Sequence, residues 1–309
     1  MDAGTEQCPC HLALTGDCLI CSRLQGRDTC DCPWEGTCPY TVFLQNGREV
    51  SPFRRERTAA LVERKEYNEG ITVLVLDVGR GFAQKASLPG SFVFLRRAEE
   101  EAQDTAVGAA HYDMPVSVLR ADETRGQIHL AIRREGTKSK RILEDNSRYV
   151  LRGPYRSGLR GAEYLKSGYL KGKKLLFLTR GIGAVPALLV MNRLMTMNDS
   201  GTLDRVQIRW LADDTKVDQN LLEEYGCVER ERREARLPEV LKEGQFDVVV
   251  IGASDYHGKR LAEIVREVLP EAKLVTANNA KMCCGEGICG ACTEVLPDGS
   301  VVRWCKCGK

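Results

Sequence analysis

The sequence predicts a multidomain α+β protein, in which a small antiparallel β-barrel precedes an α/β domain with a parallel sheet. Residues 71–151 contain short β-branched and apolar segments separated by Gly, Pro and Asp turns, which is typical of a barrel. After Gly161, apolar strands alternate with amphipathic helices, which is typical of a parallel sheet covered by helices. The positions of the cysteines add a small Cys-rich unit at each end of the chain.

The individual elements follow from these two patterns. In the barrel we expect strands at 71–78, 91–95, 115–119, 127–133 and 149–151, and a short helix at 138–143. In the α/β domain we expect strands at 173–179, 205–211, 246–251 and 273–277, and helices at 185–195 and 261–269. The charged stretch 54–65 is interpreted as a connection leading out of the N-terminal unit. The predicted domains are 1–50 (Cys-rich module), 51–158 (barrel), 159–277 (α/β domain) and 278–309 (C-terminal Cys-rich domain).

Length and charge exclude some classes of protein. The 309 residues are 43% hydrophobic, which is enough for real cores, and the net charge of +2 does not favour a nucleic-acid partner. The sequence contains no apolar run near the roughly 18 residues of a membrane span, and no secretory leader. We therefore expect a cytoplasmic protein without membrane insertion.

The cysteines are concentrated at the two ends. Of 14 cysteines, seven lie in the first 38 residues and six in the last 27, with Cys227 between them. Disulfide scaffolds are normally short secreted domains without a large core. A cysteine-poor middle and no export signal therefore favour metal or cluster ligation.

The C-terminal cysteines have the spacing of an iron–sulfur protein. Cys284, Cys289 and Cys292 form C-x₄-C-x₂-C, the plant-type ferredoxin pattern. Interleaved glycines permit the tight wrapping that such a loop needs. We predict a 2Fe–2S cluster, with Cys305 or Cys307 as the fourth ligand after a hairpin turn at 296–300. Zinc or free buried thiols are the alternatives.

The segment Met282-x-Cys284-Gly285-x-Gly287-x-Cys289-x-x-Cys292 resembles the cluster loop of the dihydroorotate dehydrogenase electron-transfer subunits, which belong to the ferredoxin–NADP reductase superfamily. The resemblance spans roughly residues 65–309. It implies an FAD-binding barrel, a nucleotide-binding α/β domain and a C-terminal 2Fe–2S domain, in this order. In that family the last cysteine is followed by x-Asp-Gly, and the run Cys305-Lys306-Cys307-Gly308 matches this frame with Cys305 as the ligand.

The resemblance also implies a flavin site on the barrel. The family has Arg-Pro-x-Ser at the start of a barrel strand, whereas this chain has Met114-Pro115-Val116-Ser117 and lacks the arginine. Gly136-Thr137 resembles the family's Gly-Thr at a helix start, where free N–H groups hold phosphate, and Arg133 or Arg134 could supply the missing charge. Taken alone, these residues fit a plain strand and a helix cap equally well. The expected FAD-binding residues are Pro115, Val116, Ser117, Arg133, Gly136 and Thr137.

The nucleotide motif is altered in the same way. Thr179-Arg180-Gly181-Ile182-Gly183 follows an apolar strand and opens a helix, where glycines let the backbone approach a pyrophosphate. The family usually has glycine at the position of Arg180, and Cys-Gly-Pro where this chain has Ile251-Gly252-Ala253. We expect NAD(P) at Gly181, Ile182, Gly183 and Gly252, with simple packing glycines as the alternative.

The N-terminal cysteines form an extra module that the simple electron-transfer subunits lack. Cys18-x₂-Cys21 has a metal-ligand spacing, and Cys30-x-Cys32 follows it. These four residues are the expected ligands of a second iron–sulfur cluster or of zinc. A redox-labile arm without metal is the alternative.

Two functional hypotheses follow. The first is an electron-transfer oxidoreductase subunit that passes electrons between NAD(P)H, FAD and a 2Fe–2S cluster, to or from a partner oxidoreductase subunit. The second is a non-reductase iron–sulfur docking or sensing subunit with a decayed nucleotide site. The changes at Met114, Arg180 and Ile251 keep the second hypothesis open.

Overall fold

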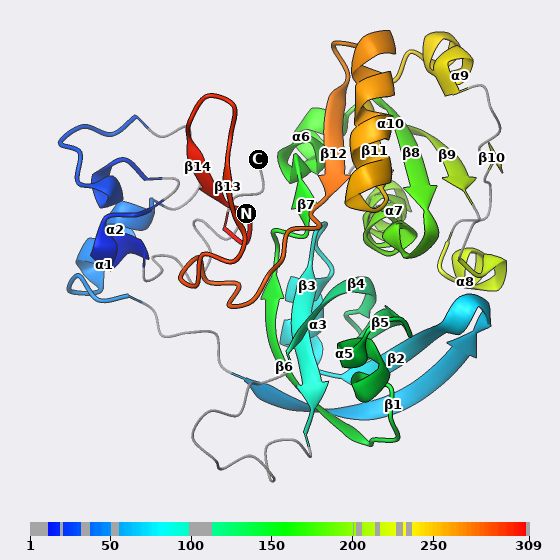
Figure 1. Ribbon diagram of the computed structural model, residues 1–309, viewed down its shortest axis with the longest axis horizontal. Helices are drawn as coiled ribbons and strands as arrows, with labels where there is room; N and C mark the ends of the chain where they lie inside the picture. The colour runs from blue at the N-terminus through cyan, green and yellow to red at the C-terminus, as the bar shows by residue number, and fades with distance from the viewer. Residues whose placement is uncertain are drawn as a thin grey trace.

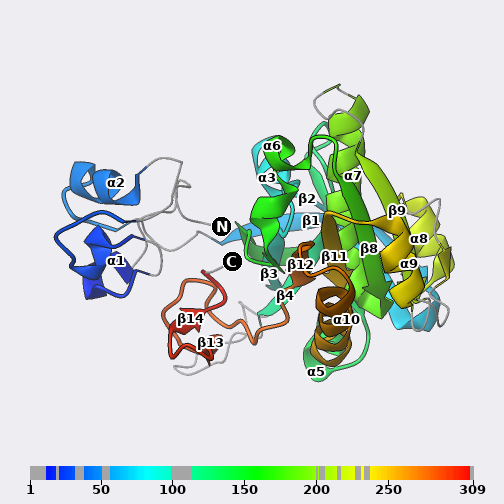
Figure 2. The ribbon, with the colours of Figure 1, turned by 90° about the horizontal axis from the view of Figure 1, so that it is seen from above.

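The computed structural model describes residues 12–18, 21–31, 38–50, 56–98, 113–199, 201, 206–213, 217–226, 231–232 and 237–306. They form a closed barrel, an α/β domain and two small Cys-rich parts (Figure 1). The C-terminal Cys-rich segment lies between the N-terminal part and the rest of the molecule in two perpendicular views (Figures 1 and 2).

The barrel is a closed antiparallel sheet in the strand order β1-β2-β5-β4-β3-β6. Its strands are β1 (Arg57–Tyr67), β2 (Ile71–Asp77), β3 (Phe92–Arg97), β4 (Met114–Asp122), β5 (Gln127–Arg133) and β6 (Arg148–Tyr155). The 3₁₀ turn η2 (Asn68–Gly70) joins β1 to β2, and the short helices α3 (Arg80–Ala86) and α5 (Thr137–Ile142) follow β2 and β5.

Strand β1 corrects the sequence prediction. The stretch 54–65 was interpreted as a connection, which is wrong from Arg57 onward, because this segment pairs with both β2 and β6. Most of its side chains are exposed or half-buried and only Ala59 is buried, so the apolar periodicity that marks a strand is missing. Backbone pairing across the barrel, rather than burial of its own side chains, makes this segment a strand.

Strand β2 is buried on both faces because it lies between the barrel interior and the α/β domain. Leu74 and Leu76 point into the barrel core, whereas Ile71, Val73 and Val75 belong to a core shared with the α/β domain. Successive side chains of a strand point to opposite faces, so a strand with two buried faces is a continuous apolar run.

The α/β domain is built on a six-stranded sheet in the order β10-β9-β8-β11-β12-β7. Its strands are β7 (Leu159–Arg160), β8 (Lys174–Arg180), β9 (Gln207–Asp213), β10 (Glu231–Arg232), β11 (Val248–Gly252) and β12 (Lys273–Ala277). All neighbours pair in parallel except β7, which pairs antiparallel with β12. The predicted parallel sheet is therefore present, with an antiparallel edge.

Helices cover both faces of this sheet. Helix α7 (Ala184–Asp199) lies in the core shared with the barrel, and α9 (Leu237–Gly244) and α10 (Asp255–Val268) pack on the other face. The remaining helical segments are η3 (Ala162–Leu165), α6 (Ser167–Leu170), η4 (Gly181–Gly183) and α8 (Gln219–Glu224). Among the described residues, no helix is both long and apolar enough to cross a membrane.

Polar groups join the barrel to helix α8. Glu224 accepts hydrogen bonds from Lys65 and Tyr67, each at 2.5 Å, and His129 Nδ1 lies 2.8 Å from the hydroxyl of Tyr225. Burial, followed by the positive charges of Arg120 and Lys65, lowers the pKa of His129 to about 4. The imidazole is therefore neutral in the folded protein near pH 7.

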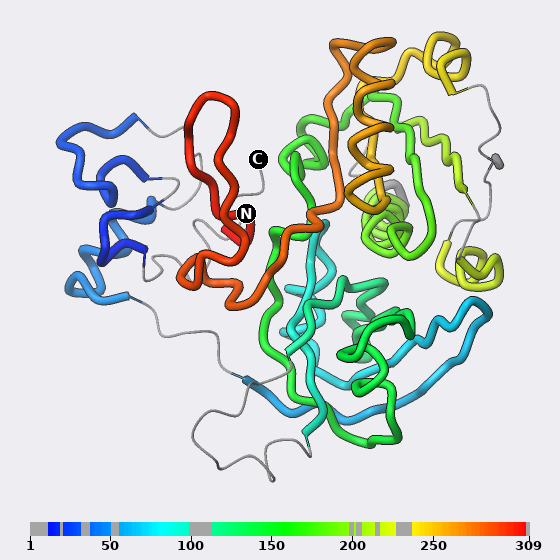
Figure 3. Tube along the Cα trace, viewed as in Figure 1, coloured from blue at the N-terminus to red at the C-terminus, as the bar shows by residue number. Residues whose placement is uncertain are grey.

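The two ends of the chain are short and loop-rich. The N-terminal part contains α1 (Leu12–Thr15), η1 (Arg23–Gln25) and α2 (Pro39–Gln45), and the C-terminal part ends in the hairpin of β13 (Thr293–Val295) and β14 (Val301–Arg303). In the chain trace, the segment after β12 runs beside the barrel before it turns into this hairpin (Figure 3). The C-terminal cysteines thereby lie next to the barrel.

Candidate functional site

A cleft of about 680 Å³ opens between the barrel and the α/β domain. This volume is within the range of small-molecule and cofactor sites. Its walls contain most of the cofactor-binding residues that the sequence predicts: Pro115, Val116, Ser117, Arg133, Gly136, Gly181, Ile182 and Gly183. Predicted residues up to 68 positions apart in the chain thus face one cavity.

The barrel wall of the cleft is formed by β4, β5 and the start of α5. Met114, which stands where the related family has arginine, lines the cleft, as does Arg133. Of the two arginines that could supply a positive charge, Arg133 faces the cleft, whereas Arg134 donates to the carbonyl of Leu143. Thr137 is not among the lining residues, but Lys138, one residue further, is.

The α/β wall is formed by the turn after β8 and by the end of β11. A Cβ atom on Gly183 would lie 2.6 Å from the backbone of Gly252, and one on Gly252 would lie 2.2 Å from the carbonyl oxygen of Gly183. The two glycines therefore allow two turns to pack backbone to backbone. Gly252 itself does not line the cleft and packs against Gly183, and its part in nucleotide binding stays a prediction.

Arg180 lies at the edge of the cleft at the carboxyl end of β8. Its Nε is 3.3 Å from Oδ2 of Asp213, which ends the neighbouring strand β9. Ile251 is buried in the core on the far face of the sheet and does not line the cleft. Of the residues that differ from the family's nucleotide motif, Arg180 and Ala253 line the cavity, whereas Ile251 does not.

Several lining residues were not predicted from the sequence. Those outside the predicted flavin and nucleotide segments are Gly158, Ala253, Ser254, His257, Ala277, Asn278 and Asn279. They carry no local motif, but most follow the carboxyl ends of β11 and β12. The rule that ligands bind outside the carboxyl ends of parallel strands could have found them.

The C-terminal cysteines converge in a loop whose amide groups point at sulfur. Gly287 N donates to Cys305 Sγ at 3.1 Å, Glu286 N to Cys284 Sγ at 3.3 Å, and Cys305 N to Cys292 Sγ at 3.4 Å. Cys289 N lies 3.5 Å from Cys284 Sγ. Gly285, Gly287 and Gly290 all have a positive φ, between 71° and 76°. The backbone thus wraps around the thiols with its N–H groups inward, as cluster ligation requires.

The four thiols share protons with one another. A hydrogen bond from the Cys305 thiol, followed by backbone N–H groups, lowers the pKa of Cys284 to about 3. The Cys305 hydrogen bond also lowers the pKa of Cys292 to about 6. Hydrogen bonds to both of these thiolates raise the pKa of Cys305, and burial raises that of Cys289. Hydrogen bonds thus favour the thiolate form at Cys284 and Cys292, which is the form that ligates metal.

Among the described residues, no group of three or more His, Cys, Asp or Glu side chains is arranged to hold a metal ion, so the cluster at these cysteines stays a prediction. A 2Fe–2S cluster divides its four ligands between two irons. Cys305 is buried among the other thiols, Cys283 is exposed, and Cys307 lies outside the described residues. Cys305 thus lies beside the other three thiols, and its role as the fourth ligand stays a prediction.

The cysteine loop docks closely on the barrel. A Cβ atom on Gly285 would lie 2.6 Å from the ring of Tyr155 and 2.8 Å from the ring of Phe94. These two rings and Phe92 form a buried aromatic group, with Phe92 and Tyr155 stacked at 5.2 Å between ring centroids. On the other side, Leu12 of the N-terminal part contacts Gly287, since a Cβ there would lie 2.8 Å from Leu12 Cδ1.

The N-terminal cysteines are only partly brought together. Cys21 is buried, and its N–H donates to Cys18 Sγ at 3.3 Å, which is the local geometry of a Cys-x₂-Cys turn. Cys30 is exposed, and Cys32 lies outside the described residues. The metal site of this module therefore stays a prediction.

Comparisons with known proteins agree with the observed fold. No family model and no curated protein matches the sequence. Among solved structures, the chain is similar to an NADH-dependent reduced ferredoxin–NADP oxidoreductase structure described for flavin-based electron bifurcation, with a TM-score of 0.57, 14% identity, 82% of this chain covered and 86% of that one.

Two further similar structures are larger proteins. Full-length CYP116B46 from Tepidiphilus thermophilus matches with a TM-score of 0.54 at 15% identity over 88% of this chain. An intact type IV self-sufficient cytochrome P450 monooxygenase matches with 0.53 at 15% identity over 87%. This chain covers 44% and 43% of their lengths. The chain therefore has the ferredoxin–NADP reductase-type fold, an antiparallel barrel followed by an α/β domain, and the predicted fold class is confirmed.

Proposed function

We propose that this protein is an electron-transfer oxidoreductase subunit, which passes electrons between NAD(P)H, FAD and a 2Fe–2S cluster, to or from a partner oxidoreductase subunit. One observation carries the proposal. The cleft combines the predicted flavin and nucleotide segments, and the cysteine tetrad docks on the same barrel one strand away. Three redox sites in one compact arrangement are what a nicotinamide-to-cluster path requires.

The barrel wall supplies the contacts that a flavin needs. The apolar side chain of Val116, opposite Ile182 of the α/β wall, offers a surface for a flat ring system, while Arg133 and Lys138 offer positive charge for phosphate. When bound, FAD would supply the exchange between two-electron and one-electron transfer. Ser117 lies among these residues and can hydrogen-bond a polar edge of the ring.

The α/β wall supplies the nucleotide side. The glycine turn at 181–183 leads into the long helix α7, whose first N–H groups have no partner within the helix. Arg180 must leave Asp213 for a nucleotide to lie over the ends of β8 and β9. We therefore expect the isolated protein to accept electrons slowly from NADH or NADPH.

A direct experiment is the visible and EPR spectroscopy of anaerobically purified full-length protein, with acid extraction of the flavin. We expect noncovalent FAD and a 2Fe–2S signal, followed by stopped-flow reduction of the flavin and then of the cluster by a nicotinamide nucleotide. Colour from iron–sulfur alone, with no flavin in the extract, would contradict the flavin assignment.

A second candidate function is an iron–sulfur docking or sensing subunit without reductase activity. The ion pair between Arg180 and Asp213 at the nucleotide edge favours it, because the pair occupies the strand ends. Binding of neither NADH nor NADPH, even with the partner subunit present, would select this alternative. The proposal of an electron-transfer subunit also includes a partner oxidoreductase subunit, a cytoplasmic location and the domain bounds 1–50, 51–158, 159–277 and 278–309.

We also propose that the N-terminal module binds metal through Cys18, Cys21, Cys30 and Cys32. The Cys18–Cys21 turn supports this assignment, since its N–H···S contact is typical of thiolate pairs that ligate metal. Elemental analysis of the full chain against a Cys18→Ser/Cys21→Ser variant tests it. We expect one iron–sulfur cluster or one zinc ion fewer in the variant, and equal metal content would refute the assignment.

A further inference from the structure

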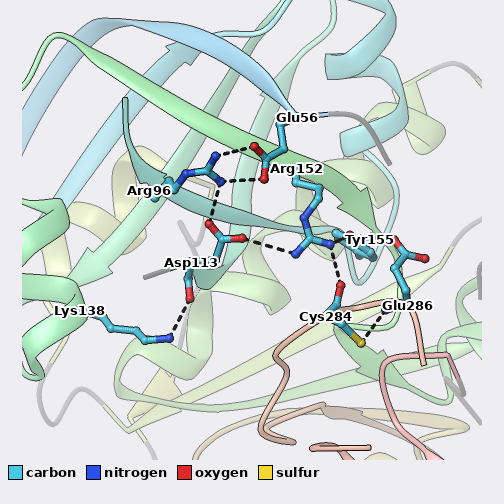
Figure 4. Close-up of polar contacts among 8 residues, drawn as sticks. All are labelled: Glu56, Arg96, Asp113, Lys138, Arg152, Tyr155, Cys284 and Glu286. Atoms are coloured by element: carbon cyan, nitrogen blue, oxygen red, sulfur yellow. Dashed lines mark hydrogen bonds and ion pairs between the residues drawn. The ribbon is translucent and has the colours of Figure 1, made fainter. Parts of the chain in front are cut away.

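A chain of polar contacts links the cofactor cleft to the cysteine tetrad through the barrel wall (Figure 4). Lys138, which lines the cleft, donates to the carbonyl of Asp113 at 2.9 Å. The Asp113 carboxylate lies 3.5 Å from Nη2 of Arg152, and Arg152 Nη1 donates to the carbonyl of Cys284 at 2.6 Å. The first cluster cysteine is thereby tied to strand β6.

The charges along this chain alternate. Glu56 pairs with the buried Arg96, Arg96 pairs with Asp113 at 3.1 Å, and Asp113 pairs with Arg152. Arg96 and Asp113 each lie between two opposite charges, and Arg152 has Asp113 on one side and a hydrogen-bond partner on the other. These partners lower the free-energy cost of burying the charges. The series ends with the guanidinium of Arg152 against the cluster loop.

The same guanidinium is held in place by aromatic rings. Its Cζ lies 4.7 Å from the ring centroid of Phe94 and 5.6 Å from that of Tyr155, and Nη1 also donates to the Tyr155 hydroxyl at 2.5 Å. Tyr155 donates in turn to Glu286 at 2.9 Å, and Lys306 pairs with Glu286 at 3.1 Å. A planar fork with several partners loses little freedom when it binds, so its position is well defined.

We propose that Arg152 is a positioning residue of the electron path, which fixes the cysteine loop on the barrel next to the cleft and places a permanent positive charge beside Cys284. Its side chain is only 14% exposed, so water screens this charge weakly. Reduction adds one negative charge to the cluster, and a nearby cation stabilises that charge. Arg152 therefore raises the reduction potential of the cluster and holds it at a constant distance from the flavin. This inference rests on the proposed cluster and flavin.

The test uses the full-length protein with Arg152→Met, Arg152→Lys and the control Arg97→Met. Arg97 lies on the adjacent strand β3 and pairs with Glu144, away from the loop. EPR-monitored titration should show that Arg152→Met lowers the equilibrium constant for cluster reduction about tenfold, which is 59 mV for one electron. Arg152→Lys should keep most of the potential, and Arg97→Met should match the wild type.

A second readout does not need a loaded cluster. In hydrogen exchange of the apoprotein, amides of residues 284–292 should exchange faster in Arg152→Met, and also in Tyr155→Phe, which keeps the packed ring but loses the bridging hydroxyl. If Arg152→Met fails to fold, Arg152→Lys and Tyr155→Phe carry the test. If the folded variants have the same amide exchange rates and the same cluster reduction potential as the wild type, the inference is overturned. Absence of a 2Fe–2S signal in the wild type would instead refute the proposed function.

Discussion

Gly285→Ala is expected to detach the cysteine loop from the barrel. Gly285 has a φ of +71°, a region that costs an alanine about 1 kcal/mol. The added methyl group would also lie 2.6 Å from Tyr155 and 2.8 Å from Phe94, both of which are buried and cannot move aside freely. Overpacking of this kind costs typically about 1–3 kcal/mol, so we expect a total of about 3 kcal/mol.

Gly290→Ala is the matched control for this substitution. Gly290 belongs to the same loop and has a φ of +74°, but a Cβ there would meet only Thr293 Oγ1, at 3.6 Å. This variant should therefore lose only about 1 kcal/mol. The difference between the two variants isolates the contact with the barrel from the conformational cost that both share.

The assay is urea denaturation of the anaerobic protein, followed by the visible absorbance of the cluster and, separately, by far-UV circular dichroism. We expect the absorbance of Gly285→Ala to disappear at lower urea than that of Gly290→Ala, while the main transition of the barrel and sheet changes little. Equal midpoints for the two variants would refute the docking geometry derived from the structure.

Three further predictions follow from the structure. Cys305→Ser should abolish the cluster, whereas Cys307→Ser should retain it, as measured by iron and sulfide content; loss in the second variant only would overturn the fourth-ligand assignment. The pKa of His129 is lowered to about 4 in the folded protein, whereas a histidine in the unfolded chain has a pKa of about 6.5. Between these two pH values the unfolded chain binds more protons than the folded one, so the free energy of unfolding should decrease as the pH falls from about 6.5 to about 4. The expected loss is about 2 kcal/mol after discounting for partial exposure. His129→Gln should flatten this pH dependence in thermal unfolding scans, and an unchanged slope would refute the assignment to His129. Arg180→Gly removes the pair with Asp213 and should tighten nicotinamide binding by up to about fivefold in stopped-flow titration, with weaker binding as the contrary result.

The sequence by itself determined that a barrel precedes an α/β domain, and it predicted the chemistry at the C-terminus. Strands with alternating or continuous apolar side chains were located because burial leaves a periodic pattern, and the spacing from Cys284 to Cys292 is restrictive because few loops can direct three thiols to one cluster. Strand β1 was missed because its side chains are mostly polar, and only pairing with β2 and β6 defines it.

Only the tertiary structure decided which residues line the cleft and which distant segments contact one another. Gly183 and Gly252 look alike as turn glycines, yet one lines the cleft and the other packs against it, a difference that depends on the approach of two loops 69 positions apart. The contact of Arg152 with Cys284 joins a barrel strand to a loop 132 positions away and leaves no local pattern. Side-chain periodicity records burial against a neighbour, but it does not record which neighbour, because that choice is made when the domains pack.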